Sequence, residues 1–459
     1  MKNKIKNIFK IILVSGWLFT SCSDWIETDF PQNQIATEQV FEDVQSANAA
    51  LAGLYGNLWN SSLISGGYDG LGALLSSYTD DLTCFYADNG NGALDLYHNQ
   101  QLSTNIMVDK VWTSTYQQIY MTNSIIHGTE NSTTISSTEK NRIIGESLFI
   151  RTLLYFNLVQ IFGDIPYTES IDYEYNRTLT KSTVSALLTK LEMDIEKAIE
   201  LLPEEYRSAE RIYVNKSTAM MLKAKLMLLS GKWQETETIS KSLLQNPSYS
   251  LEGDVTKVFT KTNHGILWQL KPKNNGDATK EYTLYYFNNS IPNRYALTQD
   301  LFNNFSSQDL RLQHWISTIT VNQNNYYRSM KYKNAAGNTT EYSVVFRIAE
   351  LYYILAESLI KQNKLTEAIS YLNVIRTRAG LPLLSTNLSA SQILQELQVD
   401  KRREFFAEMG HRFFDLKRWG LLPNLQNIKP NWQTHHKVWP LPQSELLLNS
   451  NLNPQNEGY

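Results

Sequence analysis

Cysteine is nearly absent from this chain, whose 459 residues include only Cys22 and Cys84. A fold held together by several disulfides is therefore excluded, and the chain has to rely on a hydrophobic core. Its 42% of apolar residues are enough for one large core or two moderate ones. An excess of positive charge is also missing, since the formal net charge is −3. This balance argues against a nucleic-acid partner.

Specific catalytic motifs are missing as well. The chain contains no Gly-rich phosphate loop, no Gly-x-Ser-x-Gly and no His-Glu-x-x-His. The adjacent His435 and His436 would point to opposite faces of a strand, which makes them a poor metal pair. Asp80 and Asp81 could act as paired carboxylates in glycoside hydrolysis, but such carboxylates usually come from separate elements. We therefore expect no enzyme, no bound metal and no cofactor.

The first 21 residues have the pattern of a signal peptide. Four lysines precede a short apolar run, Ile11–Phe19, which is far too short to span a bilayer. Small residues then lead to Cys22, as in a lipoprotein box, so we expect Cys22 to become an acylated N-terminus. Ordinary cleavage near this point is the alternative. Removing residues 1–21 takes away four lysines and no acid, which changes the net charge from −3 to −7.

Helical periodicity dominates the mature chain after a tether at residues 22–40. Apolar residues recur at helical spacing over about 43–245 and 347–380. Ala356 and Ala368 lie twelve residues apart, as the small residues of a tetratricopeptide repeat do. A second helical pair near Ala224 fits less well, because Thr236 stands where alanine is expected. We expect a mainly α-helical repeat scaffold in one domain, residues 41–459, with a few short strands.

Two aperiodic inserts interrupt this scaffold, at about 61–105 and 249–345. Long stretches without periodicity in a compact protein usually carry function. Within the second insert, a hairpin could pair Tyr326–Tyr332 with Glu341–Phe346 across Ala336-Gly337.

The inserts concentrate tyrosine together with Asp, Asn or Arg. We expect residues 76–98 and 277–296 to meet and to form a shallow, non-catalytic platform for sugars. Flat aromatic rings cover the apolar faces of sugars, while charged and amide groups bond the hydroxyls. The candidate stacking residues are Tyr86, Tyr97, Tyr286 and Tyr295. The candidates for hydroxyl contacts are Asp80, Asp81 and Arg294.

The C-terminal region, about 391–459, begins with charges and large aromatics interleaved over Lys401–Trp419. Ser389 and Gln392 form a predicted capping box, and Gly410 a helix stop, so a helix is expected over Ser391–Met409. A turn or second short helix should follow to Trp419. Four charged residues of this stretch are expected to be paired and partly buried, as a structural clamp. They are Arg402, Glu404, Arg412 and Asp415.

This stretch resembles the C-terminal signature of the SusD/RagB family, the nutrient-binding lipoproteins of the outer membrane. The chain departs from that signature by one added or shifted residue at Met409-Gly410. The Pro-containing end, Val438–Asn456, also resembles the family's terminus. Residues Gly145–Pro166 resemble its N-terminal signature.

The resemblance implies four tetratricopeptide-like units whose loops form a ligand face. It also implies transfer of captured nutrient, mostly glycan, to a TonB-dependent transporter of the SusC/RagA type. Acids after Cys22 resemble the surface-export signal of such lipoproteins, which favours the outer face of the outer membrane, with Cys22 as lipid anchor. Two alternatives stay open: the same architecture with an oligopeptide ligand, and a tetratricopeptide scaffold that contacts only proteins.

Overall fold

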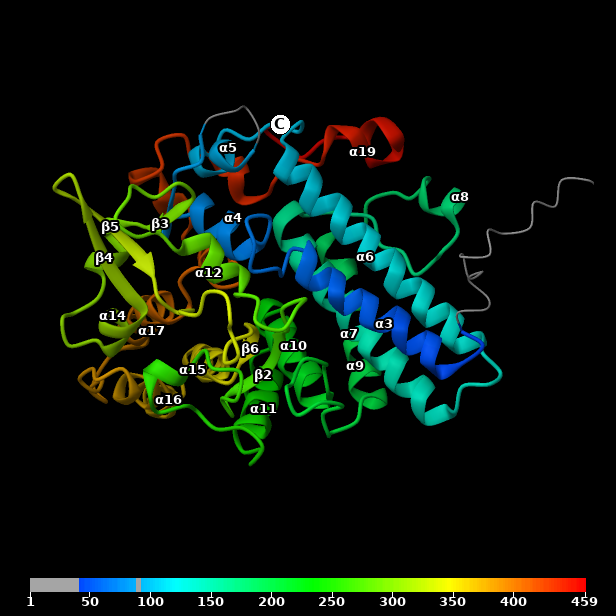
Figure 1. The fold of residues 1–459 in the computed structure, drawn as a ribbon, viewed down its shortest axis with the longest axis horizontal. Coiled ribbons are helices and arrows are strands. Elements are labelled where there is room, and N and C mark those ends of the chain that lie inside the picture. Colours follow the sequence, from blue (N-terminus) through cyan, green and yellow to red (C-terminus); the bar gives the residue numbers. More distant parts are fainter. Residues whose placement is uncertain (1–40, 88–91) are drawn as a thin grey trace, which may run out of the picture.

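Long helices that follow one another in the sequence pack as neighbours (Figure 1). The computed structural model describes residues 41–87 and 92–459. Cys22 and the tether lie outside these residues. None of the helices described is long and apolar enough to cross a membrane. The first helices of this series are α3 (Val44–Asn60), α6 (Ile106–Asn131), α7 (Ser137–Phe162), α9 (Val184–Leu201), α10 (Lys216–Leu229) and α11 (Trp233–Leu244).

Local sequence signals set the ends of these helices. The Ser136 hydroxyl accepts a hydrogen bond from the Glu139 amide at the start of α7, as the predicted cap requires. At its end Gly163 adopts a φ of 76°, a conformation that glycine reaches without steric cost. From Leu148 to Phe162 every residue of α7 is buried. This helix therefore forms the centre of the scaffold rather than one of its faces.

The second half of the scaffold contains α15 (Ala349–Lys361) and α16 (Leu365–Arg378). Ala356 and Ala368 are fully buried where these two helices meet, which confirms the predicted close approach. Helix α11 packs on α15, so the two helical pairs adjoin. Thr236, which stands where alanine is expected, is also buried. Its hydroxyl donates to the Lys232 carbonyl at the start of the same helix. The predicted helical-repeat scaffold is thus confirmed.

Two small sheets lie beside the helices. The larger has the strand order β1 (Leu82–Cys84), β3 (Tyr295–Leu297), β5 (Asn324–Ser329) and β4 (Ile316–Val321). The smaller pairs β2 (Ile266–Leu270) with β6 (Ser343–Arg347).

The predicted hairpin between Tyr326–Tyr332 and Glu341–Phe346 is wrong. Strand β5 instead turns back on β4 through Asn322 and Gln323, both of which have positive φ. Such residues suit a two-residue hairpin turn. The hairpin projects at the end of the molecule opposite α3 and α9 (Figure 1).

The first insert is less irregular than its sequence indicates. It contains α4 (Leu71–Tyr78), β1 and α5 (Ala93–His98), and much of it is buried. Its short elements show no period because few of their residues face solvent. The other short helices are α8 (Tyr173–Asn176), α12 (Lys280–Tyr285), α13 (Gln299–Asn303), α14 (Leu310–Trp315) and α19 (Gln443–Leu448). Short 3-10 helices are η1 (Val255–Lys257), η2 (Leu422–Asn427), η3 (Thr434–Lys437) and η4 (Ser450–Leu452).

The C-terminal signature forms two helices, α17 (Ala390–Phe405) and α18 (His411–Arg418). The capping box of Ser389 and Gln392 is present, as predicted. However, α17 ends four residues before the predicted Met409. The carbonyls of its last turn accept hydrogen bonds from distant side chains, including Lys331 Nζ to Glu404 O at 2.9 Å and to Phe406 O at 2.8 Å. These tertiary hydrogen bonds give the last carbonyls of the helix their partners, so the helix can end at Phe405.

Candidate functional site

The two inserts meet at the pairing of β1 with β3. Cys84 lies opposite Tyr295 in this antiparallel pair, and the Phe85 amide donates to the Arg294 carbonyl at 2.7 Å. The predicted meeting of residues 76–98 and 277–296 is therefore confirmed. This pairing brings Tyr86 against Tyr295, with ring centroids 5.4 Å apart.

Asp80 and Asp81 do not face solvent, contrary to their predicted role in binding hydroxyls. Arg412 donates to both oxygens of Asp80 at 2.7 and 2.6 Å, and Arg402 donates to Asp81 at 2.8 Å. Burial raises the pKa of Asp80, but Arg402 and Arg412 outweigh it and leave that pKa below its usual value. Both acids are therefore structural, and they fix the turn that precedes β1.

Tyr295 and Tyr97 are also poor candidates for stacking on a ligand. Tyr295 is only 1% exposed, so its ring belongs to the core. Tyr97 is half-buried, and Lys429 Nζ lies 3.7 Å from its ring centroid. The same ammonium donates to the Tyr97 and Ser77 carbonyls. Burial lowers the pKa of Lys429 to about 7. Tyr97 thus helps to bury a lysine.

Apart from the half-buried Tyr97, three predicted residues keep access to solvent. Tyr286 is 44% exposed, and Tyr86 and Arg294 are half-buried. Tyr286 stacks on Tyr282 with ring centroids 4.8 Å apart and planes 24° apart. Arg294 Nη1 donates to the Thr283 carbonyl of α12 at 2.6 Å, which ties the segment after α12 back to that helix.

Sequence reasoning missed two neighbouring tyrosines. Tyr68 is 42% exposed and accepts a hydrogen bond from Lys110 Nζ at 2.7 Å. It lies close enough to Tyr86 for the two hydroxyls to influence each other electrostatically. Tyr282 precedes Tyr286 by four residues, a spacing that could have shown them to share one helix face. We call Tyr68, Tyr86, Tyr282, Tyr286 and Arg294 the tyrosine platform.

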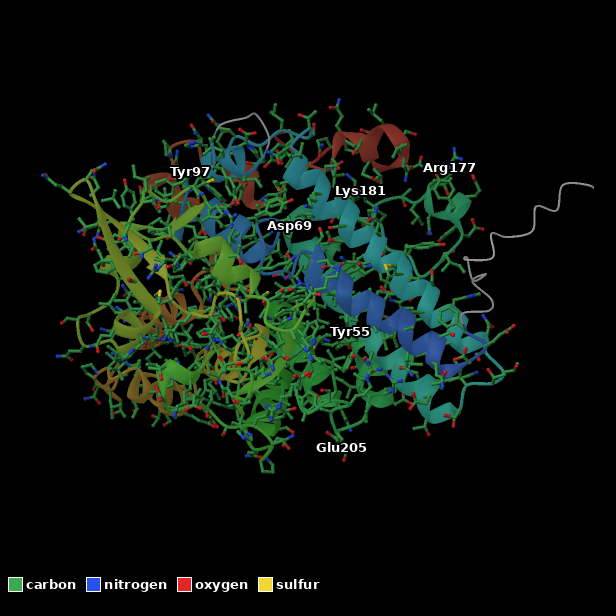
Figure 2. All side chains as sticks on the ribbon, in the orientation of Figure 1. Tyr55, Asp69, Tyr97, Arg177, Lys181 and Glu205 are labelled. Atoms are coloured by element: carbon green, nitrogen blue, oxygen red, sulfur yellow. The ribbon has the colours of Figure 1, made fainter. Side chains whose placement is uncertain are left out.

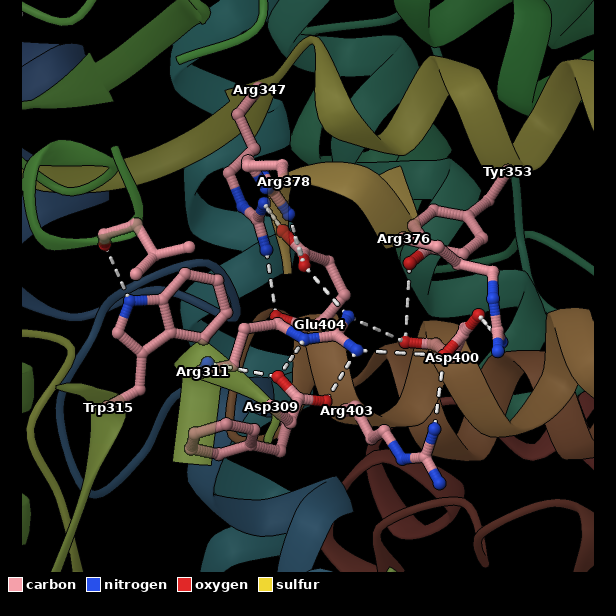
Figure 3. A network of polar contacts seen from close by, with 12 residues as sticks. Asp309, Arg311, Trp315, Arg347, Tyr353, Arg376, Arg378, Asp400, Arg403 and Glu404 are labelled. Carbon is pink, nitrogen blue, oxygen red and sulfur yellow. Dashed lines mark hydrogen bonds and ion pairs between the residues drawn. The ribbon is translucent and has the colours of Figure 1, made fainter. Parts of the chain in front are cut away.

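Acids of the C-terminal signature form a buried network of charges with arginines from other parts of the chain (Figure 3). Glu404 is fully buried and accepts hydrogen bonds from Arg347 at 2.5 Å, Arg378 at 2.5 Å and Arg311 at 3.2 Å. Burial acts to raise the pKa of Glu404, but these guanidinium groups outweigh it and hold that pKa well below its usual value. Five residues with their ion-pair partners form what we call the C-terminal clamp. They are Asp400, Arg402, Glu404, Arg412 and Asp415.

The clamp confirms that the four charged residues predicted to be paired are paired. Asp415 accepts from Lys401 at 2.7 Å and lies 2.9 Å from Arg418. Arg402 and Arg412 reach across the fold to Asp80 and Asp81, more than 300 positions earlier in the sequence. The signature therefore positions one of the two inserts that build the platform.

A cleft of about 800 Å³ lies elsewhere, between α6, α19 and the segment that contains α8. Apolar side chains dominate its lining, including Trp112, Tyr120 and Tyr173. Figure 2 places the labelled Arg177 and Lys181 toward this end of the molecule, whereas Tyr97 and Asp69 lie over α5 and α4. None of the five platform residues lines the cleft, so the cleft is separate from the platform.

No group of three or more potential metal-ligating side chains occurs within residues 41–87 and 92–459. His435 and His436 do not point to opposite faces of a strand, contrary to the expectation from the sequence: they lie in η3, and their rings contact each other and Tyr459.

Comparison with known proteins agrees with this architecture. Residues 24–228 match a family of SusD-like proteins described as starch-binding and associating with the outer membrane, and residues 298–438 match the SusD family that includes RagB. The chain belongs to the SusD/RagB family. One relative, SusD-like protein P25 of Formosa agariphila, is 25% identical over 99% of this chain and all of its own length.

Solved structures of SusD-like proteins share the fold. A SusD superfamily protein from Bacteroides vulgatus superposes with a TM-score of 0.78 at 22% identity, covering 91% of this chain and 99% of its own. Surface glycan-binding protein A from Bacteroides thetaiotaomicron, solved with laminarihexaose, gives a TM-score of 0.76 at 17% identity. These alignments cover 90% of this chain and 99% of the glycan-binding protein.

Proposed function

We propose that this protein is a non-catalytic receptor that captures oligosaccharides on the tyrosine platform. The observation that carries the proposal is the platform itself: two exposed rings, Tyr68 and Tyr286, and two half-buried rings, Tyr86 and Tyr282, from two distant inserts that β1 and β3 hold together. Flat rings cover the apolar faces of pyranoses, and a guanidinium such as that of Arg294 donates to hydroxyl oxygens. Relatives with this fold include proteins named for binding laminarin and surface glycans, which supports the same ligand class here.

The proposed cellular role is delivery of the captured glycan to a TonB-dependent transporter of the SusC/RagA type. The chain would be held at the outer face of the outer membrane by lipid on Cys22. Two or more acyl chains anchor a protein stably, whereas an unmodified chain has no such anchor. We expect Cys22→Ala to release the protein into the soluble fraction of cells that lack the transporter. Retention of that variant in the outer membrane would contradict the anchor.

Binding at the platform can be tested by calorimetry with oligosaccharides on the mature chain. We expect the double variant Tyr86→Ala, Tyr286→Ala to lose about 30-fold to 900-fold in affinity, because each of the two rings contributes roughly 1–2 kcal/mol of apolar contact. The matched control is Tyr120→Ala, Tyr173→Ala, which removes two exposed rings from the separate cleft. Wild-type affinity in the platform variant, at an unchanged melting temperature, would place the ligand elsewhere. Binding of oligopeptides but of no glycan would favour the peptide alternative.

A further inference from the structure

Several positively charged side chains lie at the tyrosine platform. Lys280 starts α12, Arg294 follows it, and Arg328 of β5 lies with its guanidinium carbon 4.8 Å from the Tyr286 ring centroid. Lys110 donates a hydrogen bond to the Tyr68 hydroxyl. The predicted acids, by contrast, are engaged in the C-terminal clamp. The platform therefore has cations at its edge, and neither of the carboxylates predicted to bind a ligand is accessible there.

Three of these cations bond to backbone carbonyls rather than to acids. Lys280 Nζ donates to Asn60 O at 2.5 Å, Arg294 Nη1 to Thr283 O at 2.6 Å and Arg328 Nη1 to Phe287 O at 2.6 Å. None of the three forms an ion pair with another residue of the described ranges 41–87 and 92–459. A carbonyl satisfies a donor but does not neutralise its charge, so the positive potential of these side chains remains.

The two acids that act on the charge of Lys280 are both buried. Asp69 is 5% exposed; it pairs with Lys110 at 3.1 Å and accepts hydrogen bonds from the Ser61 and Ser65 hydroxyls. Glu281 is 7% exposed and accepts from the Ser343 hydroxyl. Burial raises the pKa of Glu281 to about 7, so its carboxyl is partly neutral near neutral pH. Neither acid can contact a ligand that lies on the tyrosine rings.

A local excess of positive charge is unexpected here, because the chain as a whole carries a net charge of −3. Uncompensated cations around a platform of aromatic rings suit a ligand that combines apolar ring faces with negative charges. Carboxylates and sulfate groups are recognised by guanidinium and ammonium groups through charge-assisted hydrogen bonds.

We propose that the glycan captured on the tyrosine platform is anionic, bearing carboxylate or sulfate groups that Lys280 and Arg294 bind. This inference rests on the proposed function and specifies its ligand. The rings select for pyranose faces, and the two cations select for acidic substituents. Arg328, which is largely buried, contributes to the potential from beneath Tyr286 and not by direct contact.

The test is calorimetric titration of the mature chain with three oligosaccharides of equal length: a polyuronate, a sulfated galactan and a neutral glucan. We expect one or both acidic oligosaccharides to bind more tightly than the neutral one. Their affinity should fall steeply as NaCl rises from about 0.01 M to about 0.15 M, where the Debye length shrinks from about 30 Å to about 8 Å. Preference between the uronate and the sulfate ester identifies which acid the site takes.

Charge-neutralising variants localise the effect. We expect Lys280→Gln and Arg294→Gln each to weaken binding of the acidic ligand about fivefold, as the loss of one charge–charge contact in water predicts. The salt dependence should become shallower in both variants. The matched controls are Arg177→Gln and Lys181→Gln, which remove the same charge near the separate cleft and should leave affinity unchanged.

The possible outcomes distinguish a failure of the anionic-ligand inference from a failure of the proposed glycan capture. If the neutral oligosaccharide binds as tightly as the acidic ones and without salt dependence, the anionic ligand is wrong while glycan capture stands. If Tyr86→Ala, Tyr286→Ala weakens acidic-ligand binding but both Gln variants bind normally, the assignment to Lys280 and Arg294 is wrong. If no oligosaccharide of either kind binds, the proposed function itself fails.

Discussion

The C-terminal clamp and the tyrosine platform have similar compositions but opposite arrangements. Both combine arginines or lysines with large aromatics. In the clamp each guanidinium meets a carboxylate, as Arg347 meets Glu404 and Arg412 meets Asp80. On the platform Arg294 meets only a carbonyl. The difference teaches that residue types alone do not separate scaffold from site, whereas the partner of each charge does.

The two regions also treat a buried glutamate differently. Three arginines surround Glu404, whose pKa is lowered, whereas Glu281 beneath the platform has no ion-pair partner among the described residues and its pKa is raised by burial. A buried charge is stable only when it is paired. Glu404 is therefore an anion in the folded chain, whereas Glu281 is only partly ionised near neutral pH.

The largest effect in this comparison is expected for Glu404→Gln. Loss of this anion leaves three buried guanidinium groups short of a partner, so we expect a destabilisation of about 3–5 kcal/mol. Urea denaturation followed by circular dichroism measures it. Glu396→Gln is the control, because Glu396 pairs with Arg376 at a more exposed position and should cost less than about 1 kcal/mol. Equal stabilities of the two variants would contradict the structural role of the clamp.

Asp415→Ala and Arg412→Ala come next, and the structure makes them unequal. The sequence alone predicts similar costs of about 2–4 kcal/mol. Lys401, however, has Asp415 as its ion-pair partner, whereas Asp80 keeps Arg402 when Arg412 is removed. We therefore expect about 2–4 kcal/mol for Asp415→Ala and about half as much for Arg412→Ala. Urea denaturation measures both destabilisations. A larger cost for Arg412→Ala would show that Arg402 does not compensate the charge of Asp80 when Arg412 is removed.

Glu281→Gln should change the pH dependence of folding. Burial raises the pKa of Glu281 from 4.5, the value of an exposed glutamate, to about 7 in the folded chain, so wild-type stability falls as pH rises between these values. The loss is complete above the folded pKa and reaches at most about 3 kcal/mol. The variant should thus match the wild type near pH 4 and be more stable near pH 8 by about 1–3 kcal/mol. A constant difference across this pH range would show that Glu281 does not titrate as described.

Much of the fold could be predicted from the sequence because the signals are local. Helix periodicity, the capping box of Ser389 and Gln392, and the small pair Ala356 and Ala368 depend on residues within one or two helices. The meeting of the two inserts was also predictable, since both interrupt the same scaffold. The strand that pairs with β5 could not be predicted, because the sequence of a short strand carries no information on which other strand it joins.

The site was harder to predict because exposure in an aperiodic segment depends on distant partners. Asp80 and Asp81 have the residue type of hydroxyl acceptors, yet arginines more than 300 positions away bury them. Tyr295 and Tyr286 are alike in type and setting, but one lies in β3 and the other just after α12. Only the structure shows that the first ring is buried and the second exposed.

The most direct measurement is a crystal structure of the mature chain soaked with the oligosaccharide that binds best in calorimetry. Our account predicts a pyranose ring against Tyr86 or Tyr286, with an acidic substituent within hydrogen-bond distance of Arg294 or Lys280. It also predicts that the ion pairs of Asp80 and Asp81 remain intact. Sugar bound in the cleft beside Trp112 and Tyr173, with the platform empty, would contradict the central claim.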